Sequence, residues 1–169
     1  CIDPRRTRTA AQCDQHIAIR PGSDAALAAG MARILFKENL ADLDYAGQIA
    51  HDLDAYREQV EPWTPERVAE ACGIEAETVI SLARDFASAE PAMIRSGIGP
   101  QQNAFGESVV WGLSALSILS GHARSKGGGL SIFNLPDINL GLSARADLKQ
   151  EKTRSLDMTR LSEILNDET

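Results

Sequence analysis

The sequence predicts an α/β fold, a three-layer αβα arrangement in which helices flank a small parallel sheet. Short strand-like runs alternate with longer helical segments, which is typical of such sheets. The segment Phe105–Ser120 is apolar all round, so we expect a helix buried on more than one side. Cys1–Asp3 resembles a strand end. Since the first residue is not Met, we expect a piece of a longer protein whose sheet is incomplete at its N-terminal edge.

The first elements are predicted from breakers and caps. Pro4 fixes its own φ, so regular structure should stop there. A short helix over Thr9–Cys13 and a strand over His16–Ile19 are expected next. A turn then opens a longer helix, with Ser23 as its N-cap and Asp24 near the positive end of its dipole.

The later elements follow from periodicity and from start and stop signals. Thr64-Pro65-Glu66 is a helix start, and Gly73 ends that helix. The loop Lys126–Gly129 is expected to be flexible. Besides the helix starting near Asp24, the expected elements are helices at Leu43–Ala50, Leu53–Val60, Pro65–Gly73, Glu75–Ala89 and Phe105–Ser120, and a strand at Ala92–Ile94.

The regular pattern fades toward the end of the chain. We expect residues 1–130 to be part of an α/β domain. Residues 131–169 should be an irregular extension or linker, with a short helix at Thr159–Leu165.

The charge balance excludes some classes of function. With a net charge of −7 and a pI of about 5.0, the chain lacks the positive surface that nucleic acids and anionic membranes require. No apolar run approaches the ~18 residues of a membrane span. We therefore expect no nucleic-acid partner and no direct membrane insertion. We also expect a cytoplasmic location, while a periplasmic one stays open because a signal would lie outside these residues.

The cysteines and histidines predict no metal centre. Three cysteines at scattered spacings fit neither a disulfide framework nor a zinc or iron–sulfur cluster, so we expect reduced, buried thiols. No histidine has a partner at metal-ligand spacing. The residues concerned are Cys1, Cys13, Cys72, His16, His51 and His122. We assign neither a catalytic residue nor a metal ligand in this chain.

Three loops follow the predicted strands, at Asp3–Thr7, Arg20–Asp24 and Ser96–Gln102. Ligands of parallel sheets bind at the carboxyl ends of the strands, so we expect the three loops to meet at one edge. Each loop also has a plainer interpretation: a solvated turn for the first, a capped helix start for the second and a tight strand-to-helix turn for the third.

The side chains of these loops suit a nucleotide and a pterin. Asp3 can accept hydrogen bonds from a ribose or a guanine edge, and Arg5 and Arg6 carry donors that match phosphate. Asp24, beside a glycine that lets a ligand approach, can accept from N1 and N2 of guanine. Gln102 stands where a dinucleotide fingerprint would have its third glycine, and it can instead bond an amide-rich ligand such as a pterin.

One further segment, Pro65–Arg84, resembles a helix-turn-helix. Its second helix carries several acids and only Arg84 as a base. Phosphate contacts need Lys and Arg, so DNA binding is the least favoured interpretation.

Taken together, the loops resemble the molybdenum and tungsten bis-molybdopterin guanine dinucleotide oxidoreductases, which include formate dehydrogenases, nitrate reductases and dimethyl sulfoxide reductases. The resemblance runs from Cys1 to about Gly129. The matching segments are Asp3–Ala10, Cys13–Ile17, Arg20–Leu27, Glu38–Leu40, Asp44–Tyr45, Trp63–Glu66, Gly73–Ile74, Leu82–Arg84, Gly99, Gln102 and Gly106. Two departures are Gly121-His122, where the family often has Gly-Asn, and Pro100 inside the third loop.

The resemblance implies a central domain like that of formate dehydrogenase and DMSO reductase. The first two loops would contact the guanine dinucleotide, and residues of the third would approach the pterin. The implied cofactor-binding residues are Asp3, Pro4, Arg5, Arg6, Thr7, Gly22, Ser23, Asp24, Ile98, Gly99 and Gln102.

For the intact protein, the resemblance implies two-electron redox chemistry on molybdenum or tungsten, of the kind used in anaerobic respiration. A 4Fe-4S cluster, where present, and the metal ligand would lie upstream, so these residues alone should be inactive. The implied partners are the rest of the polypeptide and electron-transfer subunits. The substrate stays open. A nucleotide-binding or scaffold module without metal is the alternative interpretation.

Overall fold

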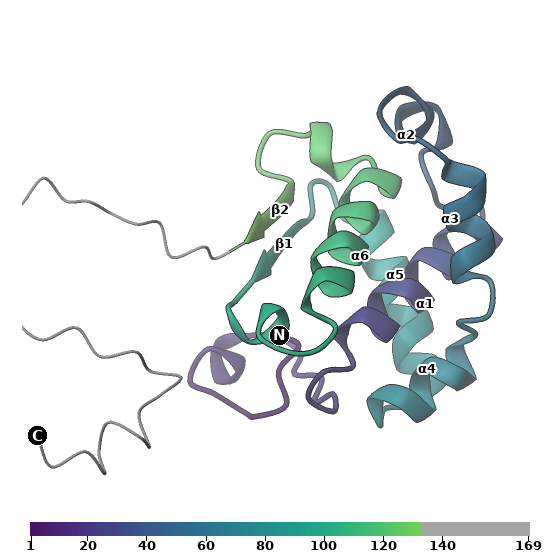
Figure 1. Ribbon diagram of the computed structural model, residues 1–169. Helices are drawn as coiled ribbons and strands as arrows, with labels where there is room; N and C mark the ends of the chain where they lie inside the picture. Colours follow the sequence, from purple (N-terminus) through teal and green to yellow (C-terminus); the bar gives the residue numbers. More distant parts are fainter. Residues whose placement is uncertain (133–169) are drawn as a thin grey trace, which may run out of the picture. The chain divides into compact units, whose positions relative to one another are not determined.

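The computed structural model describes residues 1–132, in which helices predominate (Figure 1). The helix predicted at Thr159–Leu165 lies outside these residues. The helices are α1 (Asp24–Lys37), α2 (Leu43–Ile49), α3 (Leu53–Val60), α4 (Pro65–Cys72), α5 (Ala76–Ser88) and α6 (Gly106–Leu119). The strands are β1 (Met93–Ser96) and β2 (Gly129–Ile132), and short 3-10 turns cover Ala10–Gln12, Gly99–Gln101 and His122–Arg124.

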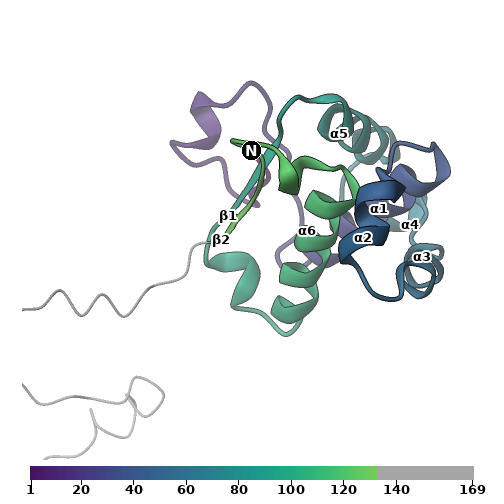
Figure 2. The ribbon, with the colours of Figure 1, turned by 90° about the horizontal axis from the view of Figure 1, so that it is seen from above.

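The sheet of the described residues is a parallel pair joined by α6. Met93 lies opposite Gly129, and Ser96 lies opposite Ile132. α6 runs between the two strands in sequence and packs against both of them (Figure 2). This arrangement confirms the predicted α/β class with a small parallel sheet. Met93 and Arg95, on the face of β1 turned away from buried Ser96, are exposed.

Two expectations about strands are wrong in detail. The loop Lys126–Gly129, which we expected to be flexible, ends in a strand that we did not predict. Gly129 is the first residue of β2, and its amide donates to the Ala92 carbonyl at 3.1 Å. The strand expected at His16–Ile19 is a single parallel bridge between Ile17 and Ile2. Residues 1 and 3 make the ladder bonds, and the Arg5 amide, which would donate the next one, donates to Asp3 Oδ1 at 2.8 Å instead, so the ladder stops after one step.

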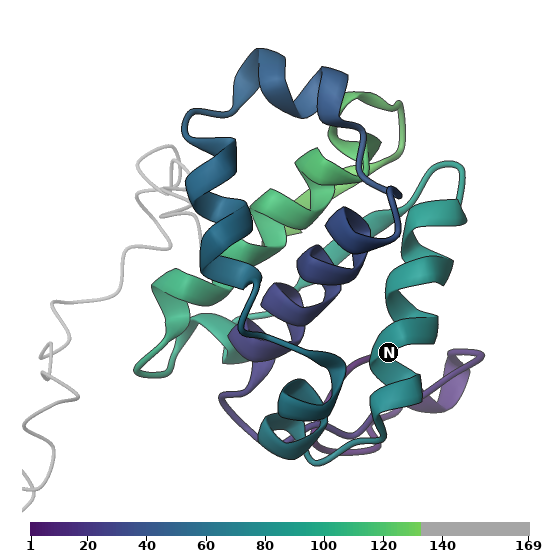
Figure 3. The same ribbon diagram turned by 90° about the vertical axis from the view of Figure 1, so that its right-hand side faces the viewer.

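Helix α1 is the centre of the hydrophobic core. It contacts α3, α4, α5 and α6, and Figure 3 shows it running between α5 and α6. Nine of its residues are buried, among them Leu35, which is 0% exposed. Close packing on several sides favours small residues, and α1 reads Asp-Ala-Ala-Leu-Ala-Ala-Gly over its first seven positions.

Two glycines allow the helices to approach closely. A Cβ added to Gly30 of α1 would lie 2.4 Å from Cγ2 of Val68 in α4. A Cβ added to Gly112 of α6 would lie 3.0 Å from Cβ of Ala28. Val68 is 0% exposed and cannot move into solvent. The distance between α1 and α4 therefore depends on the missing side chain at Gly30.

Helix ends follow the predicted signals at α4. The Thr64 hydroxyl accepts from the Arg67 amide at 3.3 Å, and Pro65 occupies the first turn. Gly73 closes the helix with φ +72°, a conformation that glycine adopts without strain. This end of α4 matters for function because it contacts the loop that precedes α1.

We predict that Gly30→Ala destabilises the protein although alanine is the better helix former. Overpacking against Val68 should cost about 1–3 kcal/mol and outweigh the gain of about 0.5–1 kcal/mol from helix propensity. The matched control is Gly47→Ala on α2, where an added Cβ meets nothing within 4 Å. Urea unfolding should show a lower midpoint for Gly30→Ala and an equal or higher one for Gly47→Ala. Equal midpoints for the two variants would contradict this packing.

Candidate functional site

The first predicted loop is held by hydrogen bonds within it. Asp3 Oδ1 accepts from the Arg5 amide at 2.8 Å, and Thr7 Oγ1 accepts from the Ala10 amide at 3.2 Å. His16 Nε2 donates to the Asp3 carbonyl at 2.8 Å. Arg5 is exposed, as is its neighbour at position 6. The loop is thus ordered by its polar side chains and leaves two guanidinium groups at the surface.

The second loop departs from the prediction at its cap. The Ser23 hydroxyl donates to the Arg20 carbonyl at 2.6 Å and makes no capping bond to α1. The expectation that this side chain caps the helix is therefore wrong, because the hydroxyl closes the preceding turn instead. Gly22 has φ +83°, and an added Cβ would meet nothing within 4 Å. The backbone at this point is strained for any other residue and open to a ligand.

The end of α4 fixes the position of this second loop. The Arg20 amide donates to the Cys72 carbonyl at 2.8 Å, and the Arg20 guanidinium donates to the Glu70 carbonyl at 2.5 Å. The Cys72 thiol donates to the Ser23 carbonyl at 3.6 Å. A side chain at Gly73 would bring its Cβ within 3.1 Å of Arg20 Nε. The loop is therefore attached to α4 through both backbone and side chains.

The three cysteines differ in burial. Cys72 is fully buried, and this burial raises the pKa of its thiol. Cys1 and Cys13 are free and exposed, so the expectation of buried thiols is wrong for these two. Both lie in the N-terminal segment, which contributes little to the core.

The acidic residue of the second loop has a raised pKa. Asp24 is half-buried at the start of α1, and burial raises the pKa of its carboxyl group. A hydrogen bond from its own amide lowers that pKa in part, and the negative charge of Asp3 raises it further. The carboxylates of Asp3 and Asp24 can only accept hydrogen bonds when ionised. A ligand with several N–H donors would relieve this repulsion.

The third loop leaves β1 and folds back on itself before α6. The Ile98 carbonyl accepts from the Gln101 and Gln102 amides at 2.9 and 3.2 Å. Gln102 is exposed. Gly106 closes the turn so tightly that a Cβ would lie 2.1 Å from the Gln101 carbonyl oxygen. This loop is therefore the tight strand-to-helix turn that we considered, with the Gln102 side chain exposed at its end.

A groove of about 510 Å³ connects the second loop with the start of α6. Sequence reasoning missed this groove, because its walls come from segments far apart in the chain. Four of its lining residues are aromatic. It is lined by Arg20, Pro21, Gly22, Ser23, Ala25, Ala26, Ala29, Tyr56, Gln59, Val60, Trp63, Ala71, Phe105, Ser108, Trp111 and Gly112.

One wall of the groove contains an unsatisfied polar group. The Tyr56 hydroxyl is buried and has no hydrogen-bond partner within residues 1–132. Burial raises the pKa of Tyr56 to about 12. The Tyr56 ring packs edge-on against Trp111 at a centroid distance of 4.7 Å. A buried hydroxyl without a partner typically costs about 1–3 kcal/mol, so this site lacks a hydrogen-bond acceptor.

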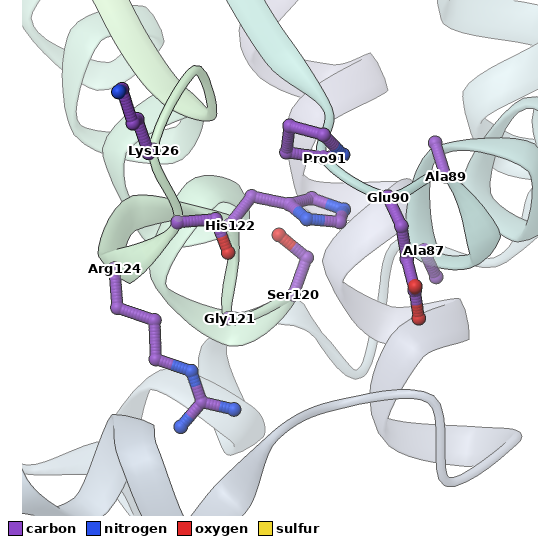
Figure 4. Close-up of a pocket in the computed structure, with 10 residues that line it drawn as sticks. Ala87, Ala89, Glu90, Pro91, Ser120, Gly121, His122, Arg124 and Lys126 are labelled. Atoms are coloured by element: carbon purple, nitrogen blue, oxygen red, sulfur yellow. The ribbon is translucent and has the colours of Figure 1, made fainter.

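A second pocket, of about 400 Å³, lies at the opposite end of the sheet (Figure 4). Its residues precede the strands: Pro91 comes before β1 and Lys126 before β2. His122 is buried, and its Nε2 donates to the Phe86 carbonyl at 2.8 Å. Arg124 in the same turn is ion-paired with Asp42. These bonds join α5 and α2 to the end of α6, which is a structural role.

The two helices that resemble a helix-turn-helix, α4 and α5, pack into the hydrophobic core. α5 packs against α1, and its Val79 and Ala83 are 0% exposed. Arg84, the single base on α5, donates to both Glu38 carboxylate oxygens at 2.8 and 2.9 Å. The base that a phosphate contact would need is therefore already paired.

Within residues 1–132, no group of three or more His, Cys, Asp or Glu side chains is placed to hold a metal ion. In the same part of the chain, no helix is both long and apolar enough to cross a membrane.

The comparison with protein families identifies the chain. The model of the molybdopterin oxidoreductase family matches residues 1–166. The chain belongs to the molybdopterin oxidoreductase family. This result confirms the resemblance, but the match continues beyond Gly129, where we expected it to end.

Relatives and a solved structure agree with this membership. The chain is 34% identical over 167 residues to a probable oxidoreductase, YoaE, of Bacillus subtilis, covering 97% of this chain and 25% of that protein. It is 37% identical over 147 residues to the dimethyl sulfoxide reductase DmsA of Escherichia coli, covering 75% and 18%. Acetylene hydratase from Pelobacter acetylenicus superposes with a TM-score of 0.68 at 28% identity, covering 72% of this chain and 17% of that one. The chain thus spans a quarter or less of the length of these proteins.

The raised pKa of Asp24 predicts a dependence of stability on pH. The carboxyl group of Asp24 binds its proton more tightly in the folded protein than in the unfolded chain, where its pKa is 3.8. The free energy of unfolding therefore falls as the pH rises from the unfolded pKa through the higher folded pKa. Asp24→Asn removes this penalty. Its unfolding midpoint should exceed that of the native sequence at about pH 7 and match it at about pH 3, where both are neutral. A lower midpoint at about pH 7 would show that the ionised carboxylate stabilises the fold.

Proposed function

We propose that residues 1–130 form part of the cofactor-binding domain of a longer oxidoreductase and hold one arm of a bis-molybdopterin guanine dinucleotide cofactor carrying molybdenum or tungsten. The observation that supports this most directly is the half-buried carboxylate of Asp24, two residues after the open backbone at Gly22. Membership of the molybdopterin oxidoreductase family supports the class of cofactor, and the residues of the loops support the way in which it would be bound.

The Asp24 carboxylate suits the Watson–Crick edge of guanine. Guanine presents N1–H and N2–H₂ donors side by side, and an ionised carboxylate presents two acceptors. Binding these donors would offset both the burial of Asp24 and its repulsion from Asp3. The absence of a side chain at Gly22 would let a planar base approach the loop.

The remaining residues would hold the other parts of the cofactor. Arg5 and Arg6 are exposed, and their guanidinium groups match the pyrophosphate. Pro4 and Thr7 shape the turn that carries them, and Ser23 closes the next turn through its hydroxyl. For the third loop we propose that Ile98, Gly99 and Gln102 approach the pterin, with the exposed Gln102 amide as the hydrogen-bonding group.

When bound, the cofactor would supply two-electron redox chemistry, while this chain would bind and orient it. We propose no catalytic residue and no metal ligand here, so the chain alone should be inactive. Three of the relatives are named as an oxidoreductase, a formate dehydrogenase and a dimethyl sulfoxide reductase, which favours redox chemistry over the reaction named for acetylene hydratase.

The proposal extends to the setting of the intact protein. The partners would be the rest of the polypeptide and electron-transfer subunits, with no nucleic acid and no direct membrane insertion. A 4Fe-4S cluster, where present, would lie upstream. We place the protein in the cytoplasm, and a periplasmic location would need a signal outside these residues.

Asp24→Asn should separate guanine recognition from folding. Asparagine keeps the size of the side chain but replaces one acceptor by an NH₂ donor, which opposes the donors of guanine. In the full-length protein we expect the GMP released by acid hydrolysis to fall by about half or more, while circular dichroism stays unchanged. Retained GMP is measured by chromatography of the hydrolysate.

The control for this experiment is Arg84→Ala. Arg84 is exposed, and its guanidinium group is paired with Glu38, which belongs to neither loop. Its GMP content should equal that of the native sequence. Unchanged GMP in Asp24→Asn, or an equal loss in both variants, would remove Asp24 from the site.

A further inference from the structure

Helix α6 carries a row of exposed side chains along one side. Phe105, which precedes the helix, Ser108 and Trp111 follow one another at intervals of three residues, so they share that side. Phe105 is 61% exposed and Trp111 is 51% exposed. Large apolar side chains gathered in a groove mark an interaction surface.

The opposite wall of the groove is also incomplete. Tyr56 of α3 is 8% exposed, yet its hydroxyl has no partner within the described residues. The Tyr56 ring packs edge-on against Trp111 at a centroid distance of 4.7 Å, and Trp111 is itself half exposed.

The lining limits what the groove can accept. Arg20 is the single charged residue among those that line it, and its guanidinium is bonded to the Glu70 carbonyl. The groove therefore suits an apolar occupant with one hydrogen-bond acceptor, and it offers no counter-charge to an ionic ligand. The sequence of α6 agrees, since a helix that is apolar all round is typical of the interior of a larger fold.

We propose that this groove is an internal interface of the longer polypeptide. An apolar segment from outside these 169 residues would fill it, and a carbonyl of that segment would accept from Tyr56. The matching relatives are at least about four times as long as the aligned part, so most of each relative lies outside it. Because Gly22 and Ser23 also line the groove, the segment would support the loop that carries Asp24. This inference rests on the proposed function only in placing the chain within a longer enzyme.

Thiol labelling of the full-length, cofactor-loaded protein tests the interface. Ser108→Cys reports on the groove, and Glu107→Cys is its matched control, because Glu107 is an exposed neighbour that does not line the groove. Each variant is treated with N-ethylmaleimide in the native and the denatured state, and peptide mass spectrometry reads the rate at each cysteine. We expect position 108 to react at least about tenfold more slowly than position 107 in the native state, after correction for the denatured rates.

Equal native rates at the two positions would overturn the proposal. Protection of position 108 that appears only as concentration rises, together with a doubled mass, would assign the groove to a second copy and would also overturn it. A second variant, Tyr56→Phe, should lower the unfolding midpoint of the full-length protein, and an unchanged or raised midpoint would show that no acceptor is present. Protection of position 108 in protein that releases no GMP would uphold the interface while contradicting the proposed function.

Discussion

The burial of α1 on several sides is the constraint on which the rest of the structure depends. Four other helices pack against this helix, and Gly30 lets α4 come close enough to exclude water. The N-terminus of α1 is therefore fixed in space by the core. The same α4 that packs on α1 also holds the preceding loop, through the bonds from Arg20 to its last turn and from Cys72 to Ser23. Packing and loop position are thus parts of one arrangement.

This arrangement explains how an otherwise unfavourable pair of charges can persist. Asp24 is kept at the start of α1 by the helix that carries it, and the loop that carries Asp3 is held by the short pairing of Ile2 with Ile17. Neither carboxylate has a basic residue as an ion-pair partner within the described chain. A rigid core can hold such acceptors in place until a ligand supplies donors, which is how binding sites are commonly preorganised. Asp24→Asn should therefore affect folding and binding in opposite directions.

The sequence predicted most of the helices because their signals are local. The cap at Thr64, the proline after it and Gly73 define α4 without help from the rest of the fold. β2 was missed because three consecutive glycines have little strand propensity, and pairing with β1 determines its structure. The cap assigned to Ser23 was wrong because its hydroxyl donates to the Arg20 carbonyl, whereas a cap would accept from an amide of α1, and the sequence does not decide between the two.

Some features of the candidate site could likewise be predicted from the sequence, and others could not. Its loops could be located from sequence, since each follows a strand-like run, and their residue types suggested the ligand class. The burial of Asp24 depends on chain folding, and so does the groove that Tyr56 and Trp111 help to form. Exposure of Trp111 could not be foreseen, because an apolar helix normally predicts complete burial.

The metal and GMP content of the full-length protein is the most direct test of the central claim, which is that this chain holds part of a guanine dinucleotide cofactor. The protein would be produced anaerobically with molybdate and tungstate, beside a known molybdoenzyme loaded in the same host. Elemental analysis and acid hydrolysis should give about one metal atom and about two GMP per chain. A folded protein with neither metal nor GMP, obtained while the reference enzyme is fully loaded, would contradict the claim and indicate a cofactor-free relative.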